Sequence, residues 1–309
     1  MNNPNASERF LIVILGPTGI GKTRIGIELA KHFSSEIISA DSRQFFKEMN
    51  IGTAVPTEEE LDSAPHWFVQ HKSIYESYSV GDFEREALQK LNDLFQKHRI
   101  VFMVGGSGLY LDAVVKGLDK FPAIDPDIRE NLEKDLEENG IVSLQEKLKK
   151  FDPEYAKKVD IQNPRRVIRA LEICIGTSKP YSHFLKQNPT TRNFSTVKIG
   201  LTAPRELIYA RIENRVDKML KAGLLKEVEK LRPQQHLNAL KTVGYKEFFP
   251  YFEGETTLEN AVEELKKNTR RFAKRQLTWF RKDQEITWFP FDVPWEEIAD
   301  FIAQKTAPQ

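Results

Sequence analysis

A pattern that could bind phosphate stands near the start of the chain, at residues 16–23. Its sequence, GPTGIGKT, matches the G-x-x-x-x-G-K-[ST] loop, in which backbone N–H groups wrap an anion and the lysine reaches the distal phosphate. The hydroxyl that follows the lysine is a candidate Mg²⁺ ligand. We expect the whole loop to line a phosphate or diphosphate site, formed by Gly16, Pro17, Thr18, Gly19, Ile20, Gly21, Lys22 and Thr23.

The segments on either side of this loop are those that the pattern requires. Residues 10–15 are an apolar run typical of a buried parallel strand, and residues 23–33 have helical periodicity. The N-terminus of that helix would direct partial positive charge at the anion. Strand, glycine turn and helix predict an α/β fold with a P-loop core.

An acidic residue, Asp41, ends a second predicted strand that begins at Glu36. We expect it at the carboxyl edge of the sheet, where open α/β sheets place their chemistry. The strand predicted at 100–104 ends instead in a glycine turn without an acid. Asp41 is compatible with three roles, as metal ligand, general base or helix cap. No asparagine-lysine-x-aspartate element is present, which argues against a GTPase.

A basic segment lies near the end of the chain, at residues 265–282. It has eight Lys and Arg residues and no acid, although the net charge of the whole chain is only +1. Its pattern is helical, and its aromatic residues lie among the basic ones, which suits a phosphate backbone with bases nearby. The alternative is a basic surface helix that acids elsewhere balance.

The composition favours a cytoplasmic protein. The 309 residues include one cysteine, Cys174, which excludes a disulfide framework and a cysteine-based zinc site. The first residues lack the layout of a signal peptide, and no apolar run is long enough to cross a bilayer. We expect no membrane contact and a monomer.

Helix signals in the middle of the chain predict an inserted lobe. Asp125 and Pro126 are typical of an N-cap and a first helical residue, and their helix should run to Gly140. The predicted parts are the first half of the core at 9–121, a helical insertion at 122–195 and the second half of the core at 196–309, which carries the basic helix. The predicted fold is an α/β P-loop parallel-sheet core with an inserted all-helical lobe.

Further motifs, in order along the chain, resemble those of the tRNA dimethylallyltransferase (tRNA isopentenyltransferase) family. They are ISADSRQ at 38–44, NIGTAVP at 50–56, GGSGLY at 105–110, NPRRVIRALE at 163–172, TVGY at 242–245 and KRQLTWFR at 274–281. The P-loop alone is common to many enzymes, but this ordered set is specific and spans nearly the whole chain. Two positions depart from the family's usual pattern, Phe46 in place of a tyrosine and Trp67 in place of a histidine.

The resemblance implies transfer of a dimethylallyl group from dimethylallyl diphosphate to the exocyclic amine of the adenosine 3′-adjacent to the anticodon in tRNA. Lys22 and a Mg²⁺ held by Thr23 would neutralise the leaving diphosphate, and Asp41 would take a proton from the amine. Contacts to the tRNA anticodon stem-loop would come from Asp41, Ser42, Arg43, Gln44, Ser107, Arg129, Arg165, Arg166, Arg169, Lys241, Gly244, Lys274, Arg275, Gln276 and Arg281.

Three other functions are compatible with parts of the sequence. An enzyme that prenylates free AMP or ATP would need neither the helical insertion nor the basic helix. A P-loop kinase that binds ATP is disfavoured because no acid follows the strand at 100–104. A non-catalytic RNA-binding module is disfavoured because Lys22, Thr23 and Asp41 are all present.

Overall fold

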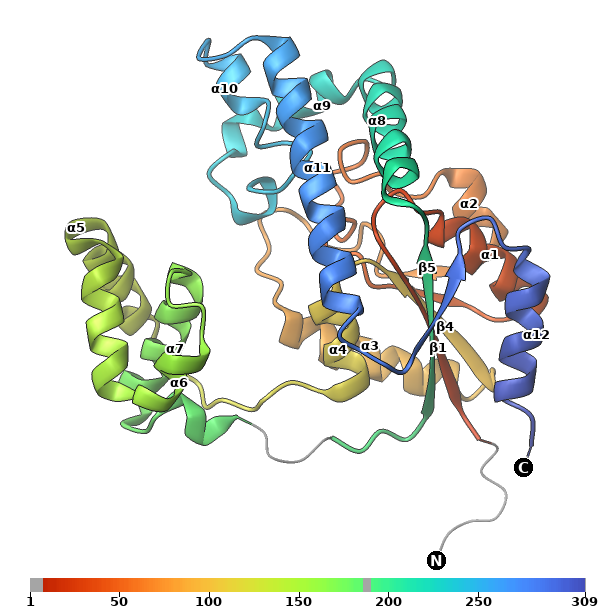
Figure 1. The fold of residues 1–309 in the computed structure, drawn as a ribbon, viewed down its shortest axis with the longest axis horizontal. Coiled ribbons are helices and arrows are strands. Elements are labelled where there is room, and N and C mark those ends of the chain that lie inside the picture. The colour runs from red at the N-terminus through yellow and green to blue at the C-terminus, as the bar shows by residue number, and fades with distance from the viewer. Residues whose placement is uncertain (1–7, 186–189, 309) are drawn as a thin grey trace, which may run out of the picture. The chain divides into compact units, whose positions relative to one another are not determined.

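The computed structural model describes residues 8–185 and 190–308, which form two compact units. The first unit comprises the chain up to Lys116 and again from Thr191 onward, and the second comprises Gly117–Thr190. In Figure 1 the first unit is a sheet with helices on both faces, and the described part of the second consists of helices and their connections.

A parallel sheet of six strands forms the centre of the first unit, in the order β3-β2-β4-β1-β5-β6. The strands are β1 (Phe10–Leu15), β2 (Ile37–Ser39), β3 (His66–Trp67), β4 (Ile100–Gly105), β5 (Ser195–Thr202) and β6 (Ile286–Pro290). Leu15 at the end of β1 pairs with Gly105 of β4 and with Gly200 of β5. The segments that follow these strands therefore meet at one edge of the sheet.

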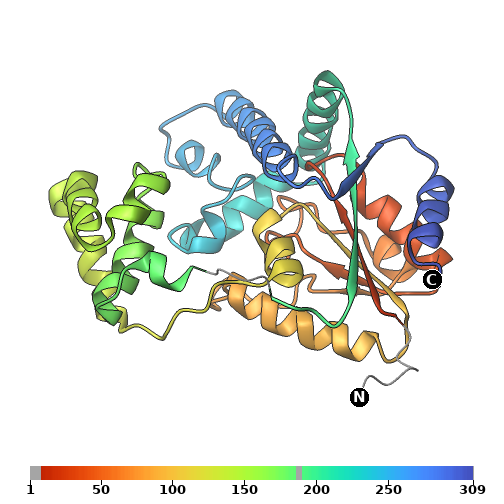
Figure 2. The same ribbon diagram turned by 60° about the horizontal axis from the view of Figure 1, so that its bottom comes forward.

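The first unit also contains helices, several of which cover the two faces of this sheet. They are α1 (Lys22–His32), α2 (Glu58–Ser63), α3 (Val80–Leu94), α4 (Gly108–Lys116), α8 (Arg205–Lys221), α9 (Leu224–Leu231), α10 (Phe249–Phe252), α11 (Leu258–Phe280) and α12 (Trp295–Lys305), with short 3₁₀ helices η2 (Arg232–Gln234) and η3 (Asn238–Leu240). Side chains of β1 alternate between two cores. Ile12 and Ile14 pack with α1, α8 and α12, and Leu11 and Val13 pack with α3 and α4. Figure 2 shows α3 along its face of the sheet.

The second unit contains α5 (Pro126–Phe151), α6 (Pro153–Lys158), α7 (Pro164–Thr177) and the 3₁₀ helix η1 (Tyr181–Phe184). The Asp125 side chain caps α5 by accepting a hydrogen bond from Asp127 N at 3.1 Å. Gly140 has a φ of 71° and interrupts α5 where the sequence predicted a helix end, but a second helical segment follows at once. Leu148 of α5 packs against Val167 and Leu171 of α7 in a core of their own.

The fold class predicted from the sequence is confirmed. The strand expected at 196–202 begins one residue earlier, at Ser195. The basic helix is longer at its start and shorter at its end than predicted, because α11 runs from Leu258 to Phe280 and leaves Arg281 and Lys282 beyond it. The boundaries of the insertion at 122 and 195 stay predictions. In the part of the chain that the structure describes, no helix has the length and apolar character needed to cross a membrane.

Candidate active site

A cavity of about 580 Å³ opens at the carboxyl edge of the sheet, within the first unit. Thr18, Lys22 and Thr23 line it from the loop after β1, and Asp41 lines it from the segment after β2. The P-loop and the acid that the sequence placed at this edge therefore share one cavity.

Glycines allow the loop after β1 to turn back onto the start of α1. Gly19 and Gly21 have φ values of 80° and 105°, in the left-handed region that other residues rarely adopt. A Cβ at Gly16 would lie 2.6 Å from the Leu201 carbonyl oxygen, so a side chain there would collide with β5. The loop can therefore present its backbone N–H groups and the N-terminus of α1 to an anion.

The Lys22 ammonium group is held inside this cavity. Its Nζ donates a hydrogen bond to the Pro17 carbonyl oxygen at 3.0 Å. Burial lowers the pKa of Lys22 to about 8, Arg215 adds to the lowering, and the charge of Asp41 opposes it. A bound diphosphate would favour the charged form, because an opposite charge raises the pKa of an amine.

Helix α8 supplies cations that belong to none of the motifs in the sequence. Arg211, Arg215 and Lys218 all line the cavity. Arg211 Nε donates to the Gly19 carbonyl oxygen at 2.8 Å, and Arg215 Nη1 donates to Thr18 Oγ1 at 3.3 Å. Their spacing of four and then three residues is that of one helix face, which is the signal that could have found them. With Lys22 they make the cavity positively charged, as an anionic ligand requires.

The Asp41 carboxylate lies where the cavity adjoins a narrow neck of about 30 Å³, and lines both spaces. Its Oδ1 accepts a hydrogen bond from Arg43 N at 3.2 Å. Burial lowers the pKa values of Lys22, Arg43 and Arg215, and the negative charge of Asp41 acts in the opposite direction and raises them. A carboxylate at this place can serve as a proton acceptor.

The neck beside Asp41 is bordered by a stacked pair, Arg43 and Phe272. The guanidinium carbon of Arg43 lies 3.8 Å from the centre of the Phe272 ring, within the range of a cation–π contact. Burial lowers the pKa of Arg43. Gly244, which the family resemblance placed against tRNA, lines the same neck but is itself buried.

The segment after β2 is fixed by polar side chains from two directions. Ser107 Oγ accepts a hydrogen bond from Ser42 N at 3.0 Å, and the hydroxyl oxygens of the two serines are also 3.0 Å apart. Gln44 is buried, and its Nε2 donates to the Ala54 carbonyl oxygen at 2.8 Å. The predicted RNA contacts Ser42, Gln44 and Ser107 thus also hold the turn that carries Asp41.

The loop at residues 50–56 is anchored by Glu227 of α9, which no motif includes. Its carboxylate accepts hydrogen bonds from Ile51 N at 2.8 Å, from Gly52 N at 3.0 Å and from the Tyr245 hydroxyl at 2.6 Å. A Cβ at Gly244, whose φ is 111°, would lie 2.7 Å from the Gly52 carbonyl oxygen. Two motifs that are far apart in the sequence therefore pack directly on one another.

The other residues predicted to bind tRNA in the first unit differ in exposure. Lys241, Lys274, Arg275 and Arg281 are exposed, as a contact to RNA phosphates requires. Gln276 is buried, and both ends of its amide bind backbone groups of the active-site loops.

The two departures from the family pattern have other surroundings than these predicted tRNA contacts. Phe46 is half-buried, and Trp67 Nε1 donates to Glu36 Oε2 at 2.7 Å.

In the second unit the predicted basic residues gather on and around α7. Arg165 and Arg166 are exposed at its first turn. Arg129 and Arg169 both reach Glu172, at 3.4 Å and 3.0 Å, and the Arg169 guanidinium lies 5.2 Å from the centre of the Phe121 ring. Arg165 and Arg166 are therefore better placed for phosphate contacts than the two arginines that already pair with Glu172.

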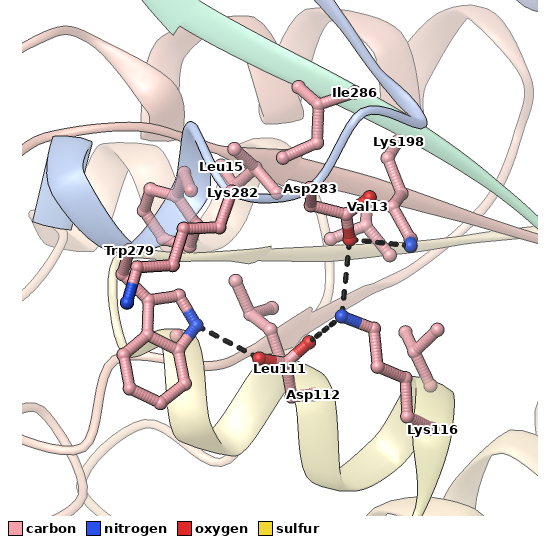
Figure 3. A pocket seen from close by; sticks show the side chains of 13 residues that line it. Val13, Leu15, Leu111, Asp112, Lys116, Lys198, Trp279, Lys282, Asp283 and Ile286 are labelled. Carbon is pink, nitrogen blue, oxygen red and sulfur yellow. Dashed lines mark hydrogen bonds and ion pairs between the residues drawn. The ribbon is translucent and has the colours of Figure 1, made fainter. Parts of the chain in front are cut away.

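A second cavity of the first unit, of about 240 Å³, lies between α4, the end of α11 and β1 (Figure 3). A chain of polar contacts runs around it and is drawn as dashed lines. Trp279 Nε1 donates to Asp112 at 2.9 Å, and Lys116 joins Asp112 at 2.8 Å to Asp283 at 3.2 Å. Lys198, which is buried, donates to Asp283 at 2.8 Å. Because these groups satisfy one another, the network ties α11 to α4 and β5.

Comparison with known families and sequences gives a consistent result. The family model described as IPP transferase matches residues 44–283. The tRNA dimethylallyltransferase of Christiangramia forsetii is 60% identical over 296 residues, which cover 96% of this chain and 98% of the relative. The enzyme of the same name from Flavobacterium johnsoniae is 54% identical over 302 residues, with the same shares covered.

Solved structures of similar proteins agree. The tRNA isopentenylpyrophosphate transferase of Bacillus halodurans is 40% identical and superimposes with a TM-score of 0.72, covering 97% of both chains. A eukaryotic dimethylallyltransferase that acts on tRNA is 28% identical with a TM-score of 0.80, over 96% of this chain and 80% of that one.

Proposed function

The chain belongs to the IPP transferase family and is a tRNA dimethylallyltransferase, and we propose that it transfers the dimethylallyl group of dimethylallyl diphosphate to the N6 amine of the adenosine 3′-adjacent to the anticodon. One observation carries the proposal. A single cavity joins a cationic P-loop, which suits a diphosphate, to the carboxylate of Asp41, which suits an amine that must lose a proton.

The cationic side of the cavity would bind the diphosphate and stabilise it as it leaves. Lys22, Arg215 and the backbone N–H groups of the P-loop are fixed before the reaction begins. As the carbon–oxygen bond of the donor breaks, its electron pair goes to the diphosphate, and negative charge grows next to these groups. Preorganised charges and dipoles at such a place lower the barrier without having to reorganise.

Asp41 would act as the general base. The N6 lone pair bonds to the first carbon of the dimethylallyl group, the amine nitrogen becomes acidic, and its proton passes to the Asp41 carboxylate. The place of Asp41 where the main cavity adjoins the neck supports this role, because donor and acceptor can then approach it from different sides. The hydrogen bond from Arg43 N keeps the carboxylate oriented.

The residues of the P-loop fit a Mg²⁺ ion that accompanies the diphosphate. The Thr23 hydroxyl lines the cavity, and Mg²⁺ is commonly held by few protein oxygens together with substrate phosphates. Among the described residues no cluster of three or more His, Cys, Asp or Glu side chains could hold a metal alone. When bound, the ion would supply further positive charge to the leaving group.

The acceptor adenosine would have to leave its stack to reach Asp41. Arg43 and Phe272 border the neck and offer a stacked cation and ring beside an extruded base. The exposed Lys274 and Arg275 of α11, and Arg165 and Arg166 of α7, would contact phosphates of the anticodon stem-loop. These basic groups favour tRNA over a free nucleotide as acceptor. A cytoplasmic location and a monomeric state stay predictions from the sequence.

The proposal is tested by offering the purified protein radiolabelled dimethylallyl diphosphate and Mg²⁺ with unmodified tRNA, with AMP or with ATP. Label in tRNA alone supports it. Label in AMP or ATP would assign the protein to mononucleotide prenylation. Phosphate release from ATP without label transfer would indicate a kinase or ATPase instead.

A further inference from the structure

Gln276 of α11 joins two backbone segments of the active site. Its Oε1 accepts a hydrogen bond from Thr18 N of the P-loop at 2.8 Å, and its Nε2 donates to the Gly106 carbonyl oxygen at 2.8 Å. Only one orientation of the amide satisfies both contacts, because the carbonyl must face an N–H and the amino group must face a carbonyl. Gln276 is 6% exposed, and its hydrogen bond to the Gly106 carbonyl is buried, whereas the one from Thr18 N is partly buried.

The glycine turn after β4 leaves room for this amide. A Cβ at Gly106 would lie 2.3 Å from Gln276 Nε2, closer than any real contact. The next residue, Ser107, holds Ser42, which stands beside Asp41. Thr18, on the other side of the amide, accepts the hydrogen bond from Arg215. One glutamine therefore meets both the loop that would hold the diphosphate and the turn that positions the general base.

The neighbours of Gln276 on α11 have a different environment. Lys274 and Arg275 are exposed, whereas Gln276 and Ala273 are buried. This turn of α11 therefore exposes two cations to solvent on one side and directs the amide of Gln276 at the P-loop on the other. Both polar atoms of Gln276 bind backbone groups, and its burial keeps the remaining N–H and lone pair away from solvent and RNA.

We propose that Gln276 is a positioning residue that fixes the P-loop and the turn after β4 relative to one another, and that it does not contact tRNA. This rests on the proposed function, since the loops matter as parts of a prenyl-transfer site. An apolar side chain of similar size would leave the buried Gly106 carbonyl without its donor and Thr18 N without its acceptor, and both segments would shift. A displacement near one ångström at reacting groups is enough to slow an enzyme by roughly 10²-fold.

The first test compares Gln276→Leu with Lys274→Ala, a neighbouring exposed residue on the same helix. For Gln276→Leu we expect kcat/KM for dimethylallyl diphosphate to fall by roughly 10²-fold, with unchanged tRNA affinity and an unchanged salt dependence of that affinity. Lys274→Ala should weaken tRNA binding and make its salt dependence shallower. Weakened tRNA binding by Gln276→Leu with normal donor kinetics would overturn the proposal.

The second test uses Gln276→Glu, which keeps the size of the side chain. An ionised carboxylate would face the Gly106 carbonyl with oxygen, whereas a protonated one donates an O–H to it and still accepts from Thr18 N. The rate relative to the wild type at the same pH should therefore rise as the pH falls. Charged groups on the elements around the junction are Lys22, Asp41, Arg43, Arg211, Arg215, Asp112, Lys274 and Arg275. A ratio that does not change with pH would contradict the proposal.

Two controls separate this inference from the function itself. Thermal unfolding of each variant shows whether it still folds. Calorimetric binding of inorganic diphosphate with Mg²⁺ needs no tRNA and no turnover, so it reports on the P-loop even if the acceptor were not tRNA. Weaker diphosphate binding by Gln276→Leu than by the wild type supports the inference, and equal binding contradicts it.

Discussion

The Arg215 guanidinium donates a hydrogen bond to the Thr18 hydroxyl at 3.3 Å, which joins α8 to the P-loop at the cavity that both residues line. The charge of Arg215 acts on Lys22, and Asp41 acts on both cations. An anion between them would be held from two directions, by a lysine of the loop and an arginine of α8.

Replacing this arginine should weaken the binding of dimethylallyl diphosphate and leave the binding of tRNA unchanged. We expect Arg215→Ala to raise the KM for dimethylallyl diphosphate by about 10–100-fold, because a charge-assisted hydrogen bond contributes about 1.5–3 kcal/mol. Steady-state kinetics with tRNA at saturation measures the effect. Lys221→Ala, at the far end of α8, is the matched control. An unchanged KM would place the diphosphate elsewhere.

Removing the proposed general base should slow the transfer step without weakening the binding of the substrates. For Asp41→Asn, which keeps the shape and the acceptor oxygen for Arg43 N, we expect the single-turnover rate to drop by about 10²–10⁴-fold. The affinity of the variant for tRNA, measured by filter binding, should equal that of the wild type. A rate near that of the wild type would exclude Asp41 as the proton acceptor.

Lys22 is expected to make the unliganded protein less stable in a pH-dependent way. Its pKa in the folded state, about 8, is below the ordinary value of 10.5, so the unfolded chain binds more protons and stability rises as the pH increases through this range. Lys22→Met should therefore stabilise the unliganded protein by about 1–2 kcal/mol near neutral pH, and the gain should vanish towards high pH. Denaturant titrations across the range measure this. Loss of stability at neutral pH in the variant would contradict it.

The Tyr245 hydroxyl should contribute to stability through Glu227. The ring is fully buried, and burial together with the nearby carboxylate raises the pKa of the phenol. We expect Tyr245→Phe to lower the free energy of unfolding by about 1.5–3 kcal/mol, the range for hydrogen bonds to charged groups. Tyr75→Phe is the control, because that side chain is 67% exposed. Equal stabilities in urea denaturation would show that the contact adds nothing.

The P-loop and Asp41 could be predicted from the sequence because each follows a short apolar strand and carries a local pattern. The fold class followed from the same segments. Gln276 illustrates what could not be predicted. Its helical face was recognisable, but its partner Thr18 lies 258 residues away, and nothing local says which backbone group a buried amide will meet.

Glu227 was missed for the same reason. It lies on a short amphipathic helix without a distinctive motif, and its role depends on the loop at 50–52, which is 175–177 residues away in the chain. The α8 arginines are an intermediate case. No motif included them; their spacing is that of one helix face, but only the packing of α8 beside the P-loop shows that this face borders the cavity.

The most direct test is to locate the transferred group. Unmodified tRNA is incubated with the protein, Mg²⁺ and labelled dimethylallyl diphosphate, then digested to oligonucleotides and nucleosides for mass spectrometry. We predict label on N6 of the adenosine 3′-adjacent to the anticodon, and none when guanosine replaces that adenosine. Label at another nucleotide, or unchanged labelling after the replacement, would contradict the proposed function.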